Sequence, residues 1–239
     1  MPNPTNPPEQ VAAPSLPQVP EPAISPAPGL APKVTLTGPT EKSRAVDYFI
    51  ALAFGKEYGS SDSGLHKWDR DIRIKVYGQP TPADRSALQL VLAELDKLTP
   101  GITLNSVSDN PNIEIHFVPE SQFSALEPKY IPTNYGFFRV WWDRTGDIYR
   151  ARILISSDGI SQKARTHLIR EELTQSLGLF NDSWEHPTSI FYQGWTTTAD
   201  YSSLDRRLIG WLYRPTLTAG MTPVQAAAAL GEFTDIVPD

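Results

Sequence analysis

The stretch HLIREELTQSLGLFNDS, residues 167–183, is the most informative part of the chain about its fold, because it joins an apolar helical stripe to a polar one. Each residue of an α-helix advances by about 100°, so His167, Glu171 and Gln175 share one narrow sector, with Ile169 and Leu173 on the other side. This spacing alone fits a polar face turned to water, since buried carboxylates are rare unless paired. The glycine and polar residues that follow favour the opposite arrangement. We predict that the polar face turns inward to meet the loop beyond the helix.

Around this helix the chain alternates strand and helix patterns, which is typical of an α+β domain. Apolar periodicity, capping residues and Gly or Pro stops predict helices over residues 41–54, 161–177, 203–214 and 222–233, and one that begins at the cap Thr81 and ends at Pro100-Gly101. Period-two alternation predicts strands over 71–78, 102–105 and 112–118, and a hairpin over 135–157 with its turn at 143–146. Strand 147–155 alternates apolar residues with arginine, which we interpret as an edge strand open to solvent or to a bound chain.

The N-terminal segment differs in character from the rest. Residues 1–39 hold 12 of the 23 prolines and show no apolar periodicity. Such a composition favours extended, semi-rigid polyproline II segments over a packed core. We predict a disordered Pro-rich spacer over 1–39, either a tail without a specific role or a tether, followed by one folded domain over 41–236.

Composition excludes several function classes. The net charge of −6, with no basic run, argues against nucleic acid as a partner. The absence of cysteine excludes disulfides and a thiol nucleophile. No apolar run approaches the ~20 residues of a membrane-spanning helix. We therefore expect no nucleic-acid partner and no transmembrane segment.

The string E-E-L-T-Q-S-L-G-L-F-N-D-S, residues 171–183, resembles the zinc motif of metzincin peptidases, H-E-x-x-H-x-x-G-x-x-H, above all its matrixin form. The resemblance implies that Glu172 stands at the general base and Gly178 at the glycine that reverses the chain, while all three histidines are replaced. It also implies a metzincin-like (zincin-like) mixed sheet with an active-site-type helix and a C-terminal helix. In the later string Ser189–Tyr192, Phe191 stands where metzincins place a methionine beneath the metal. The residues at the ligand positions are Glu171, Gln175, and Asn181 or Asp182.

A longer combination is similar to a bacterial family of unknown function that is usually found in exported proteins. It consists of E-E-x-T-Q-x-L-G-L-x-N-D at 171–182 and D-x-x-L-I-x-x-L-Y-x-P-x-L-x-x-G-M-T at 205–222, and the similarity spans about 45–235. Together with the spacer, this resemblance implies an exported, periplasmic or cell-surface protein.

The first functional hypothesis is a peptidase-type hydrolase of the cell envelope that works through Glu172 and a weakly held divalent ion. A set of Glu171, Gln175 and Asn181 or Asp182 offers only oxygen donors, which suit Ca²⁺, Mg²⁺ or Mn²⁺ better than Zn²⁺. His167, one turn before Glu171, is a further candidate ligand. His186, in the loop, is a possible partner for it.

The alternative is a catalytically inactive metzincin-like domain that binds a peptide or protein. Its polar helix face would then be satisfied by hydrogen bonds among Glu171, Gln175 and Asn181, or with arginines. The arginine candidates are Arg150, Arg152 and Arg170. An extended ligand would add at the edge of strand 147–155, beside one or two tryptophans. The tryptophan candidates are Trp141, Trp142, Trp184 and Trp195.

A third hypothesis is glycan hydrolysis by paired carboxylates. Glu171 and Glu172 diverge by about 100° on the helix, so they do not easily flank one bond. This reaction would need another acid, such as Asp147 or Asp182.

Overall fold

The computed structural model describes residues 40–55, 64–130, 132 and 134–231, which form a mixed sheet with helices. The strands are β1 (Lys67–Trp68), β2 (Ile72–Gly78), β3 (Leu104–Ser106), β4 (Ile113–Val118), β5 (Gly136–Trp142) and β6 (Asp147–Ser156). The helices are α1 (Glu41–Phe54), α2 (Pro82–Leu98), the short η1 (Glu120–Gln122) and α3 (Phe123–Leu126), α4 (Gln162–Gln175), α5 (Ser203–Leu212) and α6 (Pro223–Gly231). The predicted spacer, 1–39, and the predicted last residues of the domain, 232–236, lie outside the described residues.

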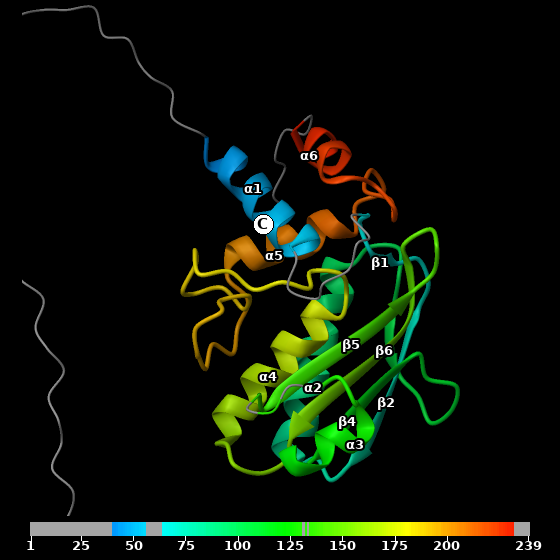
Figure 1. Ribbon diagram of the computed structural model, residues 1–239, viewed down its shortest axis with the longest axis vertical. Helices are drawn as coiled ribbons and strands as arrows, with labels where there is room; N and C mark the ends of the chain where they lie inside the picture. The colour runs from blue at the N-terminus through cyan, green and yellow to red at the C-terminus, as the bar shows by residue number, and fades with distance from the viewer. Residues whose placement is uncertain (1–39, 56–63, 131, 133, 232–239) are drawn as a thin grey trace, which may run out of the picture. The chain divides into compact units, whose positions relative to one another are not determined.

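The sheet is mostly parallel, with one antiparallel strand at its border. Strands β3, β2, β4 and β6 lie side by side and parallel, and the short β1 extends the row beside the start of β6. Strand β5 pairs with the other side of β6 and runs antiparallel to it, through the predicted hairpin (Figure 1). Gly146 closes this hairpin at φ +88°, a conformation that side chains disfavour. The parallel pairings bring together strands that are far apart in the sequence.

The prediction that strand 147–155 is an edge strand is wrong. Strand β6 lies inside the sheet, between β4 and β5, and β5 forms the border of the sheet on this side, with no further strand beyond it among the described residues. Period-two alternation separates the two faces of a strand and says nothing about its edges. Arg150 and Arg152 mark a polar face of the sheet, where both reach Glu114 of β4, at 3.4 and 3.1 Å.

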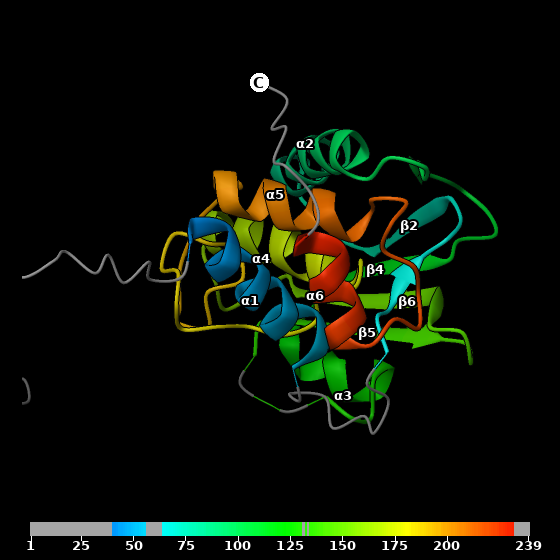
Figure 2. The ribbon, with the colours of Figure 1, turned by 90° about the horizontal axis from the view of Figure 1, so that it is seen from above.

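Two long helices, α2 and α4, pack side by side against one face of the sheet, and α1, α5 and α6 gather beyond α4 (Figure 2). Polar caps fix where the helices begin. Thr81 accepts from the backbone of Asp84 in a full capping box, and Ser161 caps α4. The predicted cap of α5 was one residue late, because Ser202 and not Ser203 accepts from the backbone of Asp205. Within the described ranges, no helix is both long and apolar enough to cross a bilayer.

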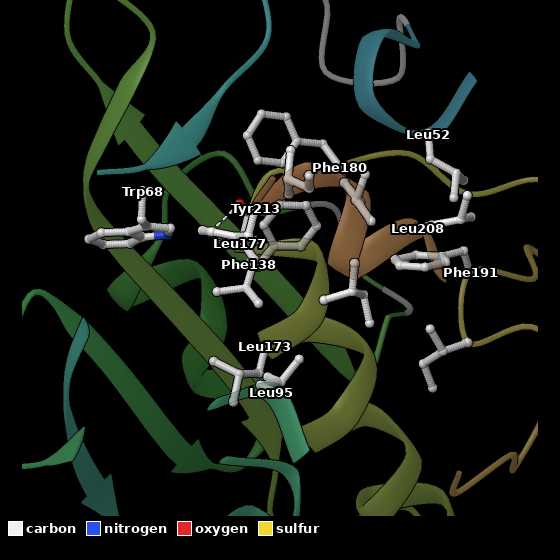
Figure 3. Packing of buried hydrophobic residues seen from close by; sticks show 14 of the residues in the cluster. Leu52, Trp68, Leu95, Phe138, Leu173, Leu177, Phe180, Phe191, Leu208 and Tyr213 are labelled. Atoms are coloured by element: carbon white, nitrogen blue, oxygen red, sulfur yellow. Dashed lines mark hydrogen bonds between the residues drawn. The ribbon is translucent and has the colours of Figure 1, made fainter. Parts of the chain in front are cut away.

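The core lies where α4 meets the sheet and the C-terminal helices (Figure 3). Leu173 and Leu177, from the predicted apolar stripe, are buried with Phe138 of β5 and Leu95 of α2. The hydroxyl of Tyr213, just after α5, donates to the carbonyl of Leu177 at 3.0 Å. Each such apolar side chain contributes about 1.5–3 kcal/mol through burial. Packing thus holds one side of α4 rigidly and fixes the direction of its polar side.

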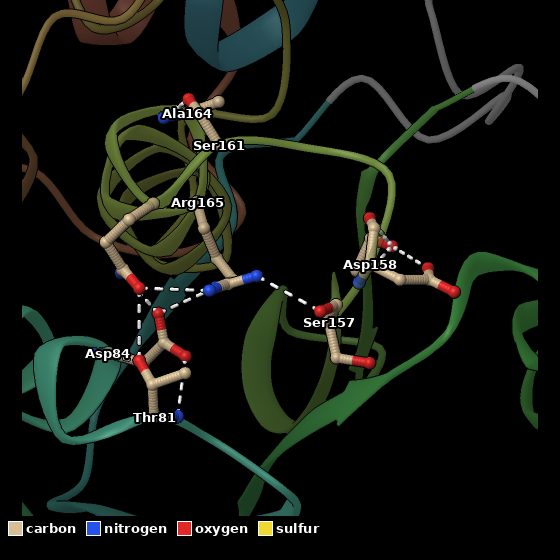
Figure 4. A network of polar contacts seen from close by, with 9 residues as sticks. Thr81, Asp84, Ser157, Asp158, Ser161, Ala164 and Arg165 are labelled. Carbon is tan, nitrogen blue, oxygen red and sulfur yellow. Dashed lines mark hydrogen bonds and ion pairs between the residues drawn. The ribbon is translucent and has the colours of Figure 1, made fainter.

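A buried ion pair joins the starts of α2 and α4 (Figure 4). Arg165 Nε donates to Asp84 Oδ1 at 2.8 Å, and the Asp84 side chain is only 1% exposed. Gln162 also donates to Asp84, and Arg165 reaches the carbonyl of Ser157. Burial by itself would raise the pKa of Asp84, but the hydrogen bonds from Gln162, Arg165 and Thr81 outweigh it, and the pKa lies below 3.8.

We predict that Asp84→Asn lowers the free energy of unfolding at pH 7 by about 3–5 kcal/mol, because Arg165 stays buried without a counter-charge. A carboxylate with a lowered folded pKa stabilises the protein above its unfolded pKa, and this contribution disappears as pH falls through the folded pKa. The difference between wild type and variant should therefore shrink below pH 3.8. Urea unfolding at several pH values measures it.

The matched control is Asp69→Asn, which removes a surface carboxylate that accepts from Arg70 and is 48% exposed. We expect a change within about 0.5 kcal/mol. An equal loss in both variants would contradict a special role for the buried pair.

Candidate functional site

A cleft of ≈ 340 Å³ lies beside α4. This volume is at the lower end of the ~300–1,000 Å³ typical of ligand pockets. Three segments form its wall: the start of β5, the polar side of α4, and the loop after α4. The lining residues are Asn134–Phe137, His167, Leu168, Glu171, Glu172, Gln175, Asp182 and residues 192–196. The polar face of α4 therefore turns toward a cleft and the loop beyond Gly178, as predicted.

The loop after α4 is held in place by backbone and side-chain bonds. Gly178 has φ +128°, and a Cβ there would collide with the carbonyl of His66, so only glycine allows this chain reversal. The backbone N–H and side-chain amide of Asn181 both donate to the carbonyl of Leu52, at 3.1 and 2.8 Å. Further along, Ser183 N–H donates to the carbonyl of Phe191 at 2.9 Å. These bonds hold residues 192–196 over the cleft.

His167 and Glu171 form an ion pair on the cleft wall. His167 Nδ1 lies 2.7 Å from the carbonyl of Thr198 and must donate to it, since a carbonyl only accepts. Its Nε2 lies 3.2 Å from Glu171 Oε2. Burial would lower the pKa of His167, but the hydrogen bond and charge of Glu171 outweigh it and raise the pKa. Both ring nitrogens are therefore engaged within the protein.

Gln175 and Asp182 bridge the helix to the loop. The side-chain amide of Gln175 donates to Asp182 Oδ1 at 2.6 Å. This bond closes one end of the cleft and places the carboxylate of Asp182 opposite α4.

Glu172 is the exception on this helix, because its carboxylate forms no hydrogen bond or ion pair with the described residues although the residue is only 7% exposed. It lines the cleft directly beneath β5. A Cβ on residue 136 would collide with Glu172 Oε1, so the missing side chain of Gly136 makes room for the carboxylate against the edge strand. Burial, then the charges of Glu171 and Asp182, raise the pKa of Glu172 well above 4.5.

The structure brings the predicted ligand positions only partly together. Glu171, Gln175, Asp182 and His167 line the cleft, whereas Asn181 is not among its lining residues and instead binds the end of α1. Among the described residues, no three His, Asp or Glu side chains are grouped so that they could hold a metal ion. His186 packs edge-on against Tyr48 at 4.6 Å and does not line the cleft.

The prediction that arginines form hydrogen bonds with this polar face is wrong. Arg150 and Arg152 bind Glu114 on the sheet, and Arg170 binds Glu94 of α2. The reason is that Arg150 and Arg152 belong to the opposite face of the sheet, and Arg170 leaves α4 toward α2. Asp147, the extra acid considered for glycan hydrolysis, accepts from Thr145 in the hairpin turn.

Sequence reasoning missed one part of the cleft wall. Residues 134–137 join it because β5, and not β6, is the edge strand. Of the four tryptophans considered, Trp195 lines the cleft, while Trp142 stacks on His66 and Trp141 lies under Arg139 and Arg150. The hairpin turn at 143–146 was the one signal that could have placed β5 beside α4.

Comparisons with known proteins identify a family for this chain. A family model described as "Protein of unknown function (DUF2927)" matches residues 42–232. No curated protein matches the chain. Two structures of myroilysin are similar at 17% sequence identity and a TM-score of 0.39. One match covers 62% of this chain and 82% of myroilysin, and the other covers 68% and 94%. A TM-score this low carries no argument about fold or activity.

We predict that Glu172→Gln stabilises the protein at neutral pH, because it replaces a buried, unpartnered carboxyl by a neutral group of the same size. A carboxyl with a raised folded pKa costs stability as pH rises from its unfolded pKa of about 4.5 through the folded one. The variant should unfold about 2–4 °C higher at pH 7, the shift that about 1 kcal/mol produces in a domain of this size. Thermal unfolding at pH 4 should show little difference.

Glu171→Gln is the matched control, since the neighbouring carboxylate has a partner in His167. It should leave the melting temperature unchanged or lower it. A rise as large as that of Glu172→Gln would mean that general charge reduction, and not the missing partner, explains the result.

Proposed function

This chain belongs to the DUF2927 family, and we propose that it is a peptidase-type hydrolase in which Glu172 is the acid–base residue. One observation carries the proposal: Glu172, a nearly buried residue whose carboxylate has no partner among the described residues, lies in a cleft against the edge strand β5, where residue 136 has no side chain. A group kept unsatisfied at such a cost is a candidate functional group.

Strand β5 supports a peptide as the substrate. The carbonyl of Tyr135 accepts from Ser156 N–H at 2.8 Å, so the Tyr135 backbone faces β6. Antiparallel strands alternate, and the backbone groups of Gly136 therefore point to the unpaired side. An extended peptide that adds there as a further strand would place its backbone beside Glu172.

The chemistry is amide hydrolysis with one carboxyl group as a proton shuttle. Ionised Glu172 accepts a proton from a water molecule, whose oxygen adds to the peptide carbonyl carbon. The protonated carboxyl then donates that proton to the amide nitrogen as the C–N bond breaks. A carboxyl whose pKa is raised suits both steps near neutral pH. The hydroxyl of Tyr192, on the cleft wall, is a donor available to the developing oxyanion.

A divalent ion is not used in this mechanism, because the donor set does not fit one. Gln175 turns its amide N–H to Asp182, His167 has both nitrogens engaged, and the described residues contain no group of three ligating His, Asp or Glu side chains.

A metzincin-like arrangement is part of the proposal. It is supported by the mixed sheet with one antiparallel edge strand, by the chain reversal at Gly178, and by α5 packed behind α4. Phe191 is fully buried within the turn 189–192, and Asp205 of α5 holds this turn by accepting from Ser189 Oγ at 2.6 Å.

A catalytically inactive peptide-binding domain is the second candidate. It is favoured by the bonds that satisfy His167, Glu171 and Gln175 within the protein. In that case Glu172 would bind the ligand and would not transfer a proton.

We also propose that the protein works outside the cytoplasm, with residues 1–39 as its spacer; the proline-rich composition supports this. Cell fractionation of the native protein should place it in an exported or envelope fraction. Recovery in the cytosolic fraction alone would overturn this part.

The hydrolase is tested by incubating the full chain with a mixed peptide library and detecting new termini by mass spectrometry. We expect cleavage by wild type and a loss of about 100- to 10,000-fold in Glu172→Gln, since general acid–base catalysis contributes that much. Parallel reactions contain EDTA or added Mn²⁺, and the rate should be the same in both.

Glu185→Gln serves as the control, because Glu185 is an exposed acid of the same loop that does not line the cleft. Its cleavage rate should equal that of wild type. Peptide binding without cleavage would establish the inactive alternative. Cleavage that appears only with Mn²⁺ would show that the reaction needs a metal ion. The absence of both binding and cleavage would reject both candidate functions.

A further inference from the structure

The charged side chains that line the cleft are mainly acidic. Glu171, Glu172 and Asp182 line it, and no lysine or arginine is among its described lining residues. Among the described lining residues, His167 has the only side chain that can carry positive charge, and Glu171 already pairs with it. The cleft therefore has an excess of negative charge in a partly water-excluded space, which attracts cations.

The missing partner of Glu172 is the independent sign of a ligand. Its carboxylate is more than nine-tenths buried, lines the cleft, and has no hydrogen bond or ion pair within the described residues. A bare divalent ion would need a converging ligand set, which those residues do not provide. An ammonium or guanidinium group carries its own hydrogen-bond donors and needs only acceptors around it.

Aromatic rings form the rim of the same cleft. Tyr135, Tyr192 and Trp195 line it, and Trp195 is 66% exposed, with its ring edge-on to Tyr135 at 6.4 Å. Trp184, also largely exposed, supports Tyr192 from behind at 5.6 Å. Exposed aromatic faces beside carboxylates bind cations and pack against the aliphatic stems that carry them.

We propose that the cleft selects peptides with a lysine or arginine, whose charged end enters between Glu171 and Asp182 and whose stem crosses Trp195. The proposal rests on the peptide binding proposed above and adds the substrate class. Asp182 lines the cleft and binds Gln175, and a carboxylate has acceptor sites on both oxygens for more than one donor. The bound cation also offsets the repulsion that Glu171 and Asp182 exert on Glu172, which makes its ionised form easier to hold.

The test compares labelled extended peptides that differ only at one central residue: lysine, arginine, norleucine or glutamate. Norleucine keeps the stem of lysine and lacks the charge. Binding is measured by fluorescence anisotropy with the full-length Glu172→Gln variant, so that cleavage does not consume the peptide. We expect the lysine and arginine peptides to bind at least about tenfold more tightly than the norleucine peptide, and the glutamate peptide to bind least.

Three further variants separate charge from packing, each made in the Glu172→Gln background. Asp182→Asn should reduce the lysine-to-norleucine ratio several-fold. Trp195→Ala should weaken lysine and norleucine peptides alike, because both lose the surface for the stem. Glu185→Gln, the exposed acid outside the cleft, should leave the ratio unchanged.

The possible results distinguish the proposed charge selectivity from the proposed peptide binding on which it rests. Equal binding of lysine and norleucine peptides overturns the charge selectivity and leaves the peptide site intact. If no peptide binds, both ideas fail. Binding of a cationic glucosamine oligomer in place of the peptides would assign the cleft to a polysaccharide and overturn the proposal.

Discussion

The need to satisfy buried polar groups governs the structure around α4. This helix is rich in polar residues and yet is packed between the sheet and the C-terminal helices. Arg165 is paired with Asp84, Arg170 with Glu94, and Gln175 with Asp182. The first two bonds tie α4 to α2, and the third ties it to the following loop. A helix held on so many sides has little freedom to turn, which fixes where its remaining side chains point.

Against this background the isolation of Glu172 is informative. Glu171, the other acid of α4, pairs with His167, whereas Glu172, beneath the edge strand β5, has no partner among the described residues. A side chain at residue 136 would fill that space. The position of the Glu172 carboxylate in α4 therefore depends on the glycine in β5. Proteins keep buried charges unpaired mainly where a ligand or a reaction uses them.

The polar side chains of α4 and the following loop set the chemical character of the cleft. Three carboxylates line the space, and two of them are bound within the protein, Glu171 by His167 and Asp182 by Gln175. A cationic side chain fits such a space better than a transition metal does. Proton transfer by a single carboxyl and recognition of a basic peptide are then compatible uses of the same wall.

Local sequence determined the helices and most of the strands, because caps, Gly and Pro stops and apolar periodicity act within a few residues. The bounds of α1, the capping box of α2 and the hairpin turn at Gly146 all follow from such short-range rules. The spacing on α4 also separated its buried stripe from its polar one. Only the tertiary structure decided the rest. The side of β6 that β5 occupies, the approach of Glu172 to Gly136 and the turn of Asn181 toward Leu52 depend on contacts between distant segments, which no periodicity in the chain records.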